Sequence, residues 1–249
     1  MQLLNKCRGF SEVDNSLKKK FILQFTILSL VLLLVVVFTS ITVKEAMNFA
    51  RNELSYVVVI DAGHGIPDGG VTGVNTGVLE SELNLFTAKT LAEYFKSAGV
   101  KTVLTRKTSR ALTSEGSDFK KSDFAERIKI IEKAAPDLVI SIHMNSYKPQ
   151  PSRRGAQVFF DLKNPLSRGL AESIQEKLNR DINKNYGGRA FSALSGDFYI
   201  INRSPAPAVI VECGFLSNAE DEKLLADEDF RKELSYVLFS ACMGYLFTL

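Results

Sequence analysis

The chain has 249 residues, an apolar content of 45% and a formal net charge of +3. Neither Pro nor Gly is in excess, and this composition excludes wholesale disorder. The basic excess is confined to residues 1–51, which carry seven Lys and Arg against three Asp and Glu; the rest carries 24 basic and 25 acidic residues. Because nucleic-acid binding needs a basic face, we expect no nucleic-acid partner.

A charge-free apolar segment, residues 21–43, follows the three lysines Lys18, Lys19 and Lys20. A helix of about 20 apolar residues spans a bilayer core, and positive flanking residues stay on the cytoplasmic side. The sequence therefore predicts a cytoplasmic segment at residues 1–20, a transmembrane anchor at 21–43, a tether at 44–54, and an extracytoplasmic catalytic domain at 55–249.

A cleaved signal peptide is the alternative to an uncleaved anchor. Signal peptides have an apolar region of about 7–15 residues followed by an A-x-A-like site. The apolar run of residues 21–43 is longer, and no clear site of that kind follows it. The pattern favours an anchor, and both interpretations export the domain.

The elements expected in the exported domain alternate between strands and helices. Strands are predicted at residues 56–61, 101–105, 138–142, 156–161 and 209–211, and helices from residue 80 to Gly99, at 123–134, from Asn164 and Pro165 to Gly187, and from residue 229 onward. Residues 62–77 and 106–121 read as loops. This order predicts a single α/β domain with a mixed, mainly parallel sheet flanked by helices.

The three cysteines are Cys7, Cys213 and Cys242, and none of them belongs to a Cys-x-x-Cys pair. Cys7 precedes the apolar segment, so it is expected in a different compartment from the other two. We predict no disulfide framework, and we expect Cys213 and Cys242 to be small buried side chains.

The chain contains two histidines, His64 and His143, and each follows a predicted strand. Because open α/β sheets bind ligands at the carboxyl ends of their strands, the two should meet at one edge. Two histidines and one carboxylate are a common ligand set for catalytic zinc. Glu80 opens the next helix and is the best third ligand, whereas Glu82 lies about 200° further around that helix. The alternative is that the histidines are structural and Glu80 merely favours its helix N-terminus.

Glu212 follows the predicted strand of residues 209–211, at the same edge of the sheet as the histidines. A zinc hydrolase also needs a general base that accepts a proton from the attacking water. Glu212 is the candidate for this role. The alternative is a solvated charge at the end of a strand.

Four segments, VVVIDAGHG, LESELNL, VISIHMNS and VIVECGFLSN, occur in this order from about Tyr56 onward. Together they resemble the signatures of the zinc-dependent N-acetylmuramoyl-L-alanine amidases of the Amidase_3 family. The resemblance implies a mixed sheet with flanking helices and peptidoglycan as the substrate. It also implies Zn²⁺ bound by His64, Glu80 and His143, Glu212 as the catalytic glutamate, and a structural role for Arg127.

Within this family, the arrangement of one hydrophobic segment, a short tether and a bare catalytic domain is like that of the germination-specific, CwlD-type amidases. This likeness implies a role in the maturation of the spore cortex and an activating protein partner of unknown identity. Two alternatives are a zinc peptidase that acts within the peptidoglycan stem peptide and a non-catalytic wall-binding regulator on the same fold.

Overall fold

The structure is a computed structural model that describes residues 2–53, 56–113, 116 and 118–249. Two compact units divide the chain between residues 53 and 54. The first unit is helix α1 (Gln2–Glu53), and the second is a domain that contains all the strands described.

Helix α1 contains the segment Leu17–Lys44, whose most apolar 18-residue window has a mean hydropathy of 2.9. Among the described residues it is the one helical segment that is long and apolar enough to cross a membrane. The expected anchor, residues 21–43, lies within it. Of the expected tether, residues 44–53 continue α1, and residue 54 lies outside the described residues.

The domain is built on a six-stranded sheet of β1 (Val57–Ala62), β2 (Lys101–Leu104), β3 (Leu138–Asn145), β4 (Gln157–Phe160), β5 (Leu194–Ser195) and β6 (Ala208–Phe215). The strands are arranged in the order β2-β1-β3-β6-β4-β5. All neighbours are parallel except β4 and β6, which are antiparallel. The predicted mixed, mainly parallel sheet is confirmed.

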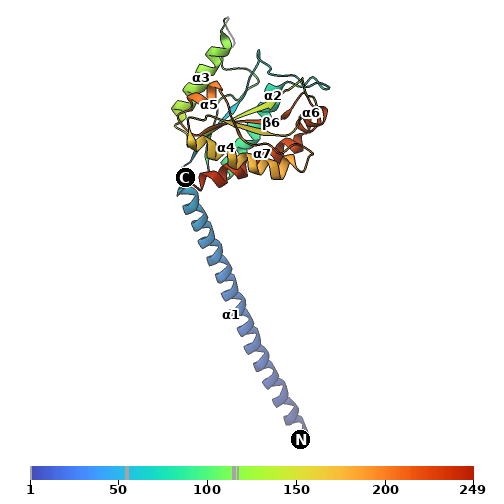
Figure 1. Ribbon diagram of the computed structural model, residues 1–249. Helices are drawn as coiled ribbons and strands as arrows, with labels where there is room; N and C mark the ends of the chain where they lie inside the picture. Colours follow the sequence, from blue (N-terminus) through green and yellow to red (C-terminus); the bar gives the residue numbers. More distant parts are fainter. Residues whose placement is uncertain (1, 54–55, 114–115, 117) are drawn as a thin grey trace. The chain divides into compact units, whose positions relative to one another are not determined.

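Helices cover both faces of this sheet (Figure 1). Helices α2 (Glu80–Ser97), α4 (Pro165–Leu178) and α7 (Glu228–Leu246) pack over the larger core, which includes Val58, Ile60 and Leu238. Helices α3 (Phe119–Ala134) and α5 (Tyr199–Arg203) cover a smaller core on the opposite face, around Val59 and Val139. The C-terminal helix α7 is thus a core helix, as predicted.

The alternation of side chains along each strand decides which residues reach the site. Val59, Val139, Ile210 and Phe159 belong to the smaller core, beneath α3 and α5. Since successive side chains in a strand point to opposite faces, residues two positions from these share their face. The polar residues placed there by this rule are Asp61, Ser141, Glu212 and Gln157, and His143 follows Ser141 by two positions.

The helix boundaries follow local chemistry. The Asn164 side chain accepts hydrogen bonds from the backbone N–H groups of Leu166 (3.0 Å) and Ser167 (3.3 Å), which confirms the predicted start of α4 at Pro165. After Leu178 the chain continues as a five-residue π-helix, η1 (Asn179–Asn183), before it reaches Gly187.

Three short elements were not predicted, namely β5, α5 and α6 (Ala219–Ala226). Each is too short for its apolar residues to show a clear period. Helix α3 begins at Phe119, although the sequence predicted a loop as far as residue 121. Strand β6 extends to Phe215, because its pairing with β3 continues past Val211.

Candidate metal centre

Three side chains from separate elements meet beyond the carboxyl end of β1. His64 follows β1, Glu80 opens α2, and His143 lies near the end of β3. Glu80 Oε1 lies 3.2 Å from His64 Nε2 and 3.0 Å from His143 Nδ1. One potential ligand atom from each residue lies within 4.8 Å of the other two, so the three could hold a metal ion.

The Glu80 carboxylate is held firmly in place. It is only 2% exposed, and its Oε2 accepts a hydrogen bond from the backbone N–H of Val71 at 2.9 Å. Its Oε1 accepts from the Met144 backbone N–H at 3.1 Å and from Asn84 Nδ2 at 3.2 Å. Burial alone would raise the pKa of Glu80, but hydrogen bonds to His143 and His64 hold it well below its usual range. The group therefore stays ionised, as a metal ligand requires.

The orientation of His64 is set by its backbone and by Asp68. His64 has a φ of 59°, a left-handed conformation that turns the chain sharply after Gly63. Its Nδ1 lies 2.9 Å from Asp68 Oδ2, and Asp68 Oδ1 lies 3.2 Å from Lys120 Nζ. A proton on Nδ1 leaves the Nε2 lone pair directed toward Glu80.

Two glycines allow these side chains to approach closely. A Cβ atom at Gly63 would lie 2.3 Å from the His143 ring, and one at Gly70 would lie 2.4 Å from Glu80 Oε2. Real Cβ atoms do not come so near other atoms, so a larger residue at either position would displace a side chain of the candidate centre.

Two buried arginines fix the backbone that carries His64. Arg127 donates from Nη1 to the Ala62 carbonyl at 2.7 Å and from Nη2 to the His64 carbonyl. Arg106 donates to the carbonyls of Ala62 and Gly63, both at 2.8 Å. Neither guanidinium is a ligand-type group, and the structural role expected for Arg127 is confirmed.

Asp61 compensates the charge of Arg127 together with Asp123, whose Oδ2 lies 2.6 Å from Arg127 Nε. Its Oδ1 lies 2.7 Å from Arg127 Nη1, and its two oxygens accept hydrogen bonds from Thr105 and Ser141, each at 2.6 Å. Although burial raises the pKa of Asp61, Arg127 and the two hydroxyls outweigh this effect and hold it at about 2.

Glu212 lies next to His143 across the β3–β6 pair, in register with it. Its Oε2 is inaccessible to solvent and has no hydrogen-bond partner among the residues that the structure describes. Burial, reinforced by the charge of Glu80, raises the pKa of Glu212 to about 7, against the opposing effect of His143 and His64. A carboxyl with this pKa can both accept and donate a proton near neutral pH.

A cleft of about 330 Å³ opens over the two histidines. It is lined by His64, Asp68, Phe119, Phe124 and His143, among others, and α3 forms one of its walls. The centre is therefore open to a ligand on the side of the sheet that α3 covers.

The domain matches the Amidase_3 family, described as N-acetylmuramoyl-L-alanine amidase, over residues 58–241. The chain belongs to this family. It is an amidase, its substrate is peptidoglycan, and the resemblance seen in the four sequence segments is confirmed.

Relatives of this amidase include the germination-specific N-acetylmuramoyl-L-alanine amidase of Bacillus subtilis, 29% identical over 76% of the chain and 79% of the relative. Among solved structures, the CwlD amidase of Clostridioides difficile in complex with the GerS lipoprotein has a TM-score of 0.73 at 28% identity, over 78% of the chain and 100% of that protein. The amidase AmiC2 of Nostoc punctiforme has a TM-score of 0.66 at 27% identity, over 77% of the chain and 97% of that protein.

The structure brings together the three ligand candidates of the amidase that the sequence identified. It also separates the two acidic candidates of α2, because Glu80 is buried and Glu82 is exposed. The supporting residues Asp68, Asn84 and Arg106 were not identified from the sequence. Asp68 lies four residues after His64, but only the loop conformation shows that the two side chains meet.

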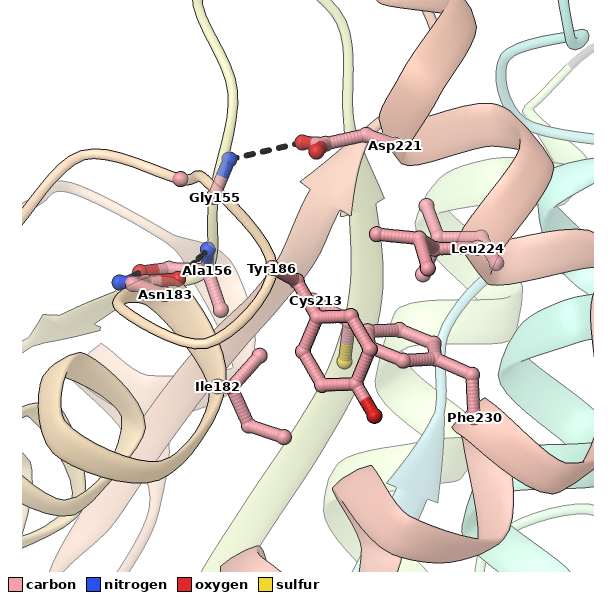
Figure 2. Close-up of a pocket in the computed structure, with 11 residues that line it drawn as sticks. Gly155, Ala156, Ile182, Asn183, Tyr186, Cys213, Asp221, Leu224 and Phe230 are labelled. Carbon is pink, nitrogen blue, oxygen red and sulfur yellow. Dashed lines mark hydrogen bonds between the residues drawn. The ribbon is translucent and has the colours of Figure 1, made fainter.

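A second cavity of about 250 Å³ lies apart from the metal centre (Figure 2). Cys213 points into it together with Tyr186, Leu224 and Phe230, and Asp221 closes one end by accepting a hydrogen bond from the Gly155 N–H at 2.7 Å. Cys213 belongs to the larger core, whereas Glu212 faces the opposite side of the sheet. Cys213 and Cys242 are buried and free, as expected, and the side chain of Cys7 lies outside those described.

Proposed function

We propose that this amidase binds one zinc ion through His64, Glu80 and His143 and hydrolyses the amide that joins the lactyl group of N-acetylmuramic acid to L-alanine. The observation that carries the proposal is the cluster of three potential ligand atoms within 4.8 Å beside Glu212. Hydrolysis of this amide is the activity for which the family is named.

The residues present fit zinc. Two imidazole nitrogens and one carboxylate oxygen form a common ligand set for catalytic zinc, which leaves a coordination position free. Glu80 is ionised, and His64 is oriented through Asp68, which is the supporting arrangement that metal-bound histidines usually have. No Cys Sγ belongs to the cluster, so the set differs from a closed structural site.

Zinc and Glu212 have different roles in the proposed reaction. When bound, zinc polarises the scissile carbonyl and makes the attacking water more acidic. Glu212 accepts the proton that this water loses and passes it to the leaving nitrogen of L-alanine, a role that its place beside His143 across the β3–β6 pair supports. Arg106 and Arg127 hold the His64 loop still while the proton moves.

Metal exchange tests the zinc assignment. Residues 52–249, purified and stripped with a chelator, should release no free stem peptides from peptidoglycan, and one equivalent of zinc should restore the activity. Restoration by magnesium alone, or full activity without metal, would contradict the proposal.

We further propose that the protein is anchored in the cytoplasmic membrane by residues 21–43, with its catalytic domain on the outer side, and that it acts in maturation of the spore cortex. The hydropathy of Leu17–Lys44 and the likeness to a germination-specific amidase support this. Since the CwlD structure contains the GerS lipoprotein, an activating lipoprotein partner is proposed here as well.

A deletion strain tests the sporulation role. If the enzyme removes stem peptides from cortex muramic acid, the mutant should form spores whose cortex lacks muramic δ-lactam and which germinate poorly. Normal δ-lactam content would overturn the sporulation role and leave the amidase activity unaffected.

A further inference from the structure

Arg153 lies in an aromatic enclosure beyond the carboxyl ends of β3 and β6. The carbon at the centre of its guanidinium is 5.6 Å from the ring centroid of Tyr147, 5.4 Å from that of Phe191 and 5.3 Å from that of Phe215. Each ring is within the range of a cation–π contact, so the three together fix the position of the positive charge.

This charge is close to the proposed general base. Arg153 Nη2 donates to Gln157 Oε1 at 3.1 Å, and Gln157 is the register partner of Glu212 in the antiparallel β4–β6 pair. Side chains directly opposite in such a pair share a face, with Cβ atoms about 4.5–5.5 Å apart. Arg153 is therefore one side chain away from Glu212, on the side of Glu212 opposite His143.

The positive charge of Arg153 has no anionic partner within the described part of the chain. No carboxylate there lies within ion-pair distance of it, and its Nε is inaccessible to solvent and has no hydrogen-bond partner. The neighbouring Arg154 contrasts with it, because its Nε lies 3.2 Å from Asp221 Oδ1. Because Nε is buried, a carboxylate would bind the outer end of this guanidinium, which is only partly buried and which donates one hydrogen bond, from Nη2 to Gln157, within the described part of the chain. A carboxylate can accept two parallel hydrogen bonds from a guanidinium.

We propose that Arg153 binds the free carboxylate of the stem-peptide residue that follows L-alanine. The inference rests on the proposed function. With the scissile carbonyl at the metal centre and the leaving nitrogen at Glu212, the stem peptide continues past Glu212 toward β4. The first carboxylate along that path belongs to the glutamyl residue after L-alanine, and Arg153 is the cation that it meets.

A purely structural role for Arg153 predicts a different outcome. The guanidinium would then only pack the segment that leads into β4 against Phe191 and Phe215. In that case, removing the guanidinium would lower kcat/KM for all substrates alike, regardless of their charge. Charge recognition predicts a loss that depends on the substrate carboxylate.

The test compares two synthetic muramoyl peptides that differ only in whether this carboxyl group is free or amidated. The zinc-loaded full-length chain in detergent is assayed as wild type, Arg153→Met, Arg153→Lys and the control Arg168→Met. Arg168 pairs with Glu172 on the exposed side of α4, over the opposite face of the sheet. Thermal unfolding of each variant shows whether it has kept its fold.

Arg153→Met should lower kcat/KM for the free acid about tenfold or more, mainly through KM, and should change that for the amide less than twofold. Arg153→Lys should recover part of the loss, and Arg168→Met should resemble the wild type. Equal losses on both substrates, or no loss on the acid, would overturn the proposal.

A binding experiment separates this inference from the proposed function. Calorimetry measures the affinity of wild type and Arg153→Met for the free stem peptide, as the acid and as the amide. If the wild type binds the acid more tightly than the amide and Arg153→Met does not, the inference is supported. This holds even if the wild type cleaves neither muramoyl peptide, a result that would refute the proposed hydrolysis but not the role of Arg153. Equal affinities in all four combinations would overturn the inference.

Discussion

His143 and Glu212 are register partners on the neighbouring parallel strands β3 and β6, so their side chains lie next to each other on one face of the sheet. The pairing places a potential metal ligand beside a carboxyl group whose pKa is raised to about 7 by burial. Because strand pairing fixes this relationship, the proposed ligand and the proposed general base stand side by side without depending on the conformation of a loop.

Replacing Glu212 with Gln should show whether Glu212 acts as a general base or as a metal ligand. Gln keeps the shape and a carbonyl acceptor but cannot take up a proton at neutral pH. Loss of a general base typically costs about 10²–10⁴ in rate. We expect Glu212→Gln to bind zinc normally, to unfold at the wild-type temperature or higher, and to turn over at least about a hundredfold more slowly.

Metal content gives the decisive comparison for this variant. If Glu212→Gln loses its zinc, Glu212 is a ligand and the assignment of Glu80 fails. If the variant keeps near-normal activity, the base lies elsewhere.

Removing either histidine should remove the metal. His64→Ala and His143→Ala each delete one of three proposed protein ligands, and we expect both variants to lose most of their zinc and all measurable activity. Metal analysis of purified protein checks this directly, with Glu82→Ala as the control, because Glu82 is exposed on the same helix as Glu80. A full equivalent of zinc in both histidine variants would disprove the ligand set.

The buried Asp61–Arg127 pair should make the domain sensitive to acid. The pKa of Asp61 falls from 3.8 to about 2 in the folded state, so its stabilising effect is complete above about pH 4 and is lost as the pH falls through 2. The shift corresponds to about 2 kcal/mol. Urea unfolding of residues 52–249 at pH 6 and pH 2.5 measures the part of this effect that is lost before the pH reaches the folded-state pKa.

Asp61→Asn is the matched variant for this experiment. At pH 6 it removes one of the two carboxylates that pair with Arg127, since Asp123 Oδ2 remains 2.6 Å from Arg127 Nε, and it should cost about 1–3 kcal/mol of unfolding free energy. Between pH 6 and pH 2.5 its stability should fall less steeply than that of the wild type. An equal slope for both proteins would show that Asp61 does not carry the acid sensitivity.

The topology predicted from the lysines and the apolar run can be tested in cells. A reporter fused after Leu249 should behave as extracytoplasmic, and the full-length protein should stay in the membrane fraction. A shortened protein released in soluble form would indicate a cleaved signal peptide instead.

The parts of the fold that the sequence predicted are those with a strong local pattern. The apolar runs of β1 and β3 and the helical spacing in α2 and α4 depend on side chains that are close in sequence. The short elements α5 and β5 depend instead on tertiary contacts, since Phe198, before α5, packs against Phe159 of β4. Such contacts leave no periodic signal in the chain.

In the candidate site, too, some residues could be predicted from the sequence and others depend on tertiary structure. His64, Glu80 and His143 could be predicted because parallel strands bring their carboxyl ends to one edge of the sheet. The contacts of Asp68 with His64 and of Arg153 with three aromatic rings depend on loop conformations. Loop conformations are not determined by a pattern of residue types, so these residues emerged only from the structure.

The proposed hydrolysis of the muramoyl–L-alanine amide can be tested by identifying the bond that the enzyme cuts. Residues 52–249 loaded with zinc are incubated with purified peptidoglycan, and the products are analysed by mass spectrometry and N-terminal labelling. We predict stem peptides with a new free L-alanine amino group and glycan strands with free lactyl carboxyl groups. Cleavage within the stem peptide, with L-alanine still attached to muramic acid, would contradict the proposal.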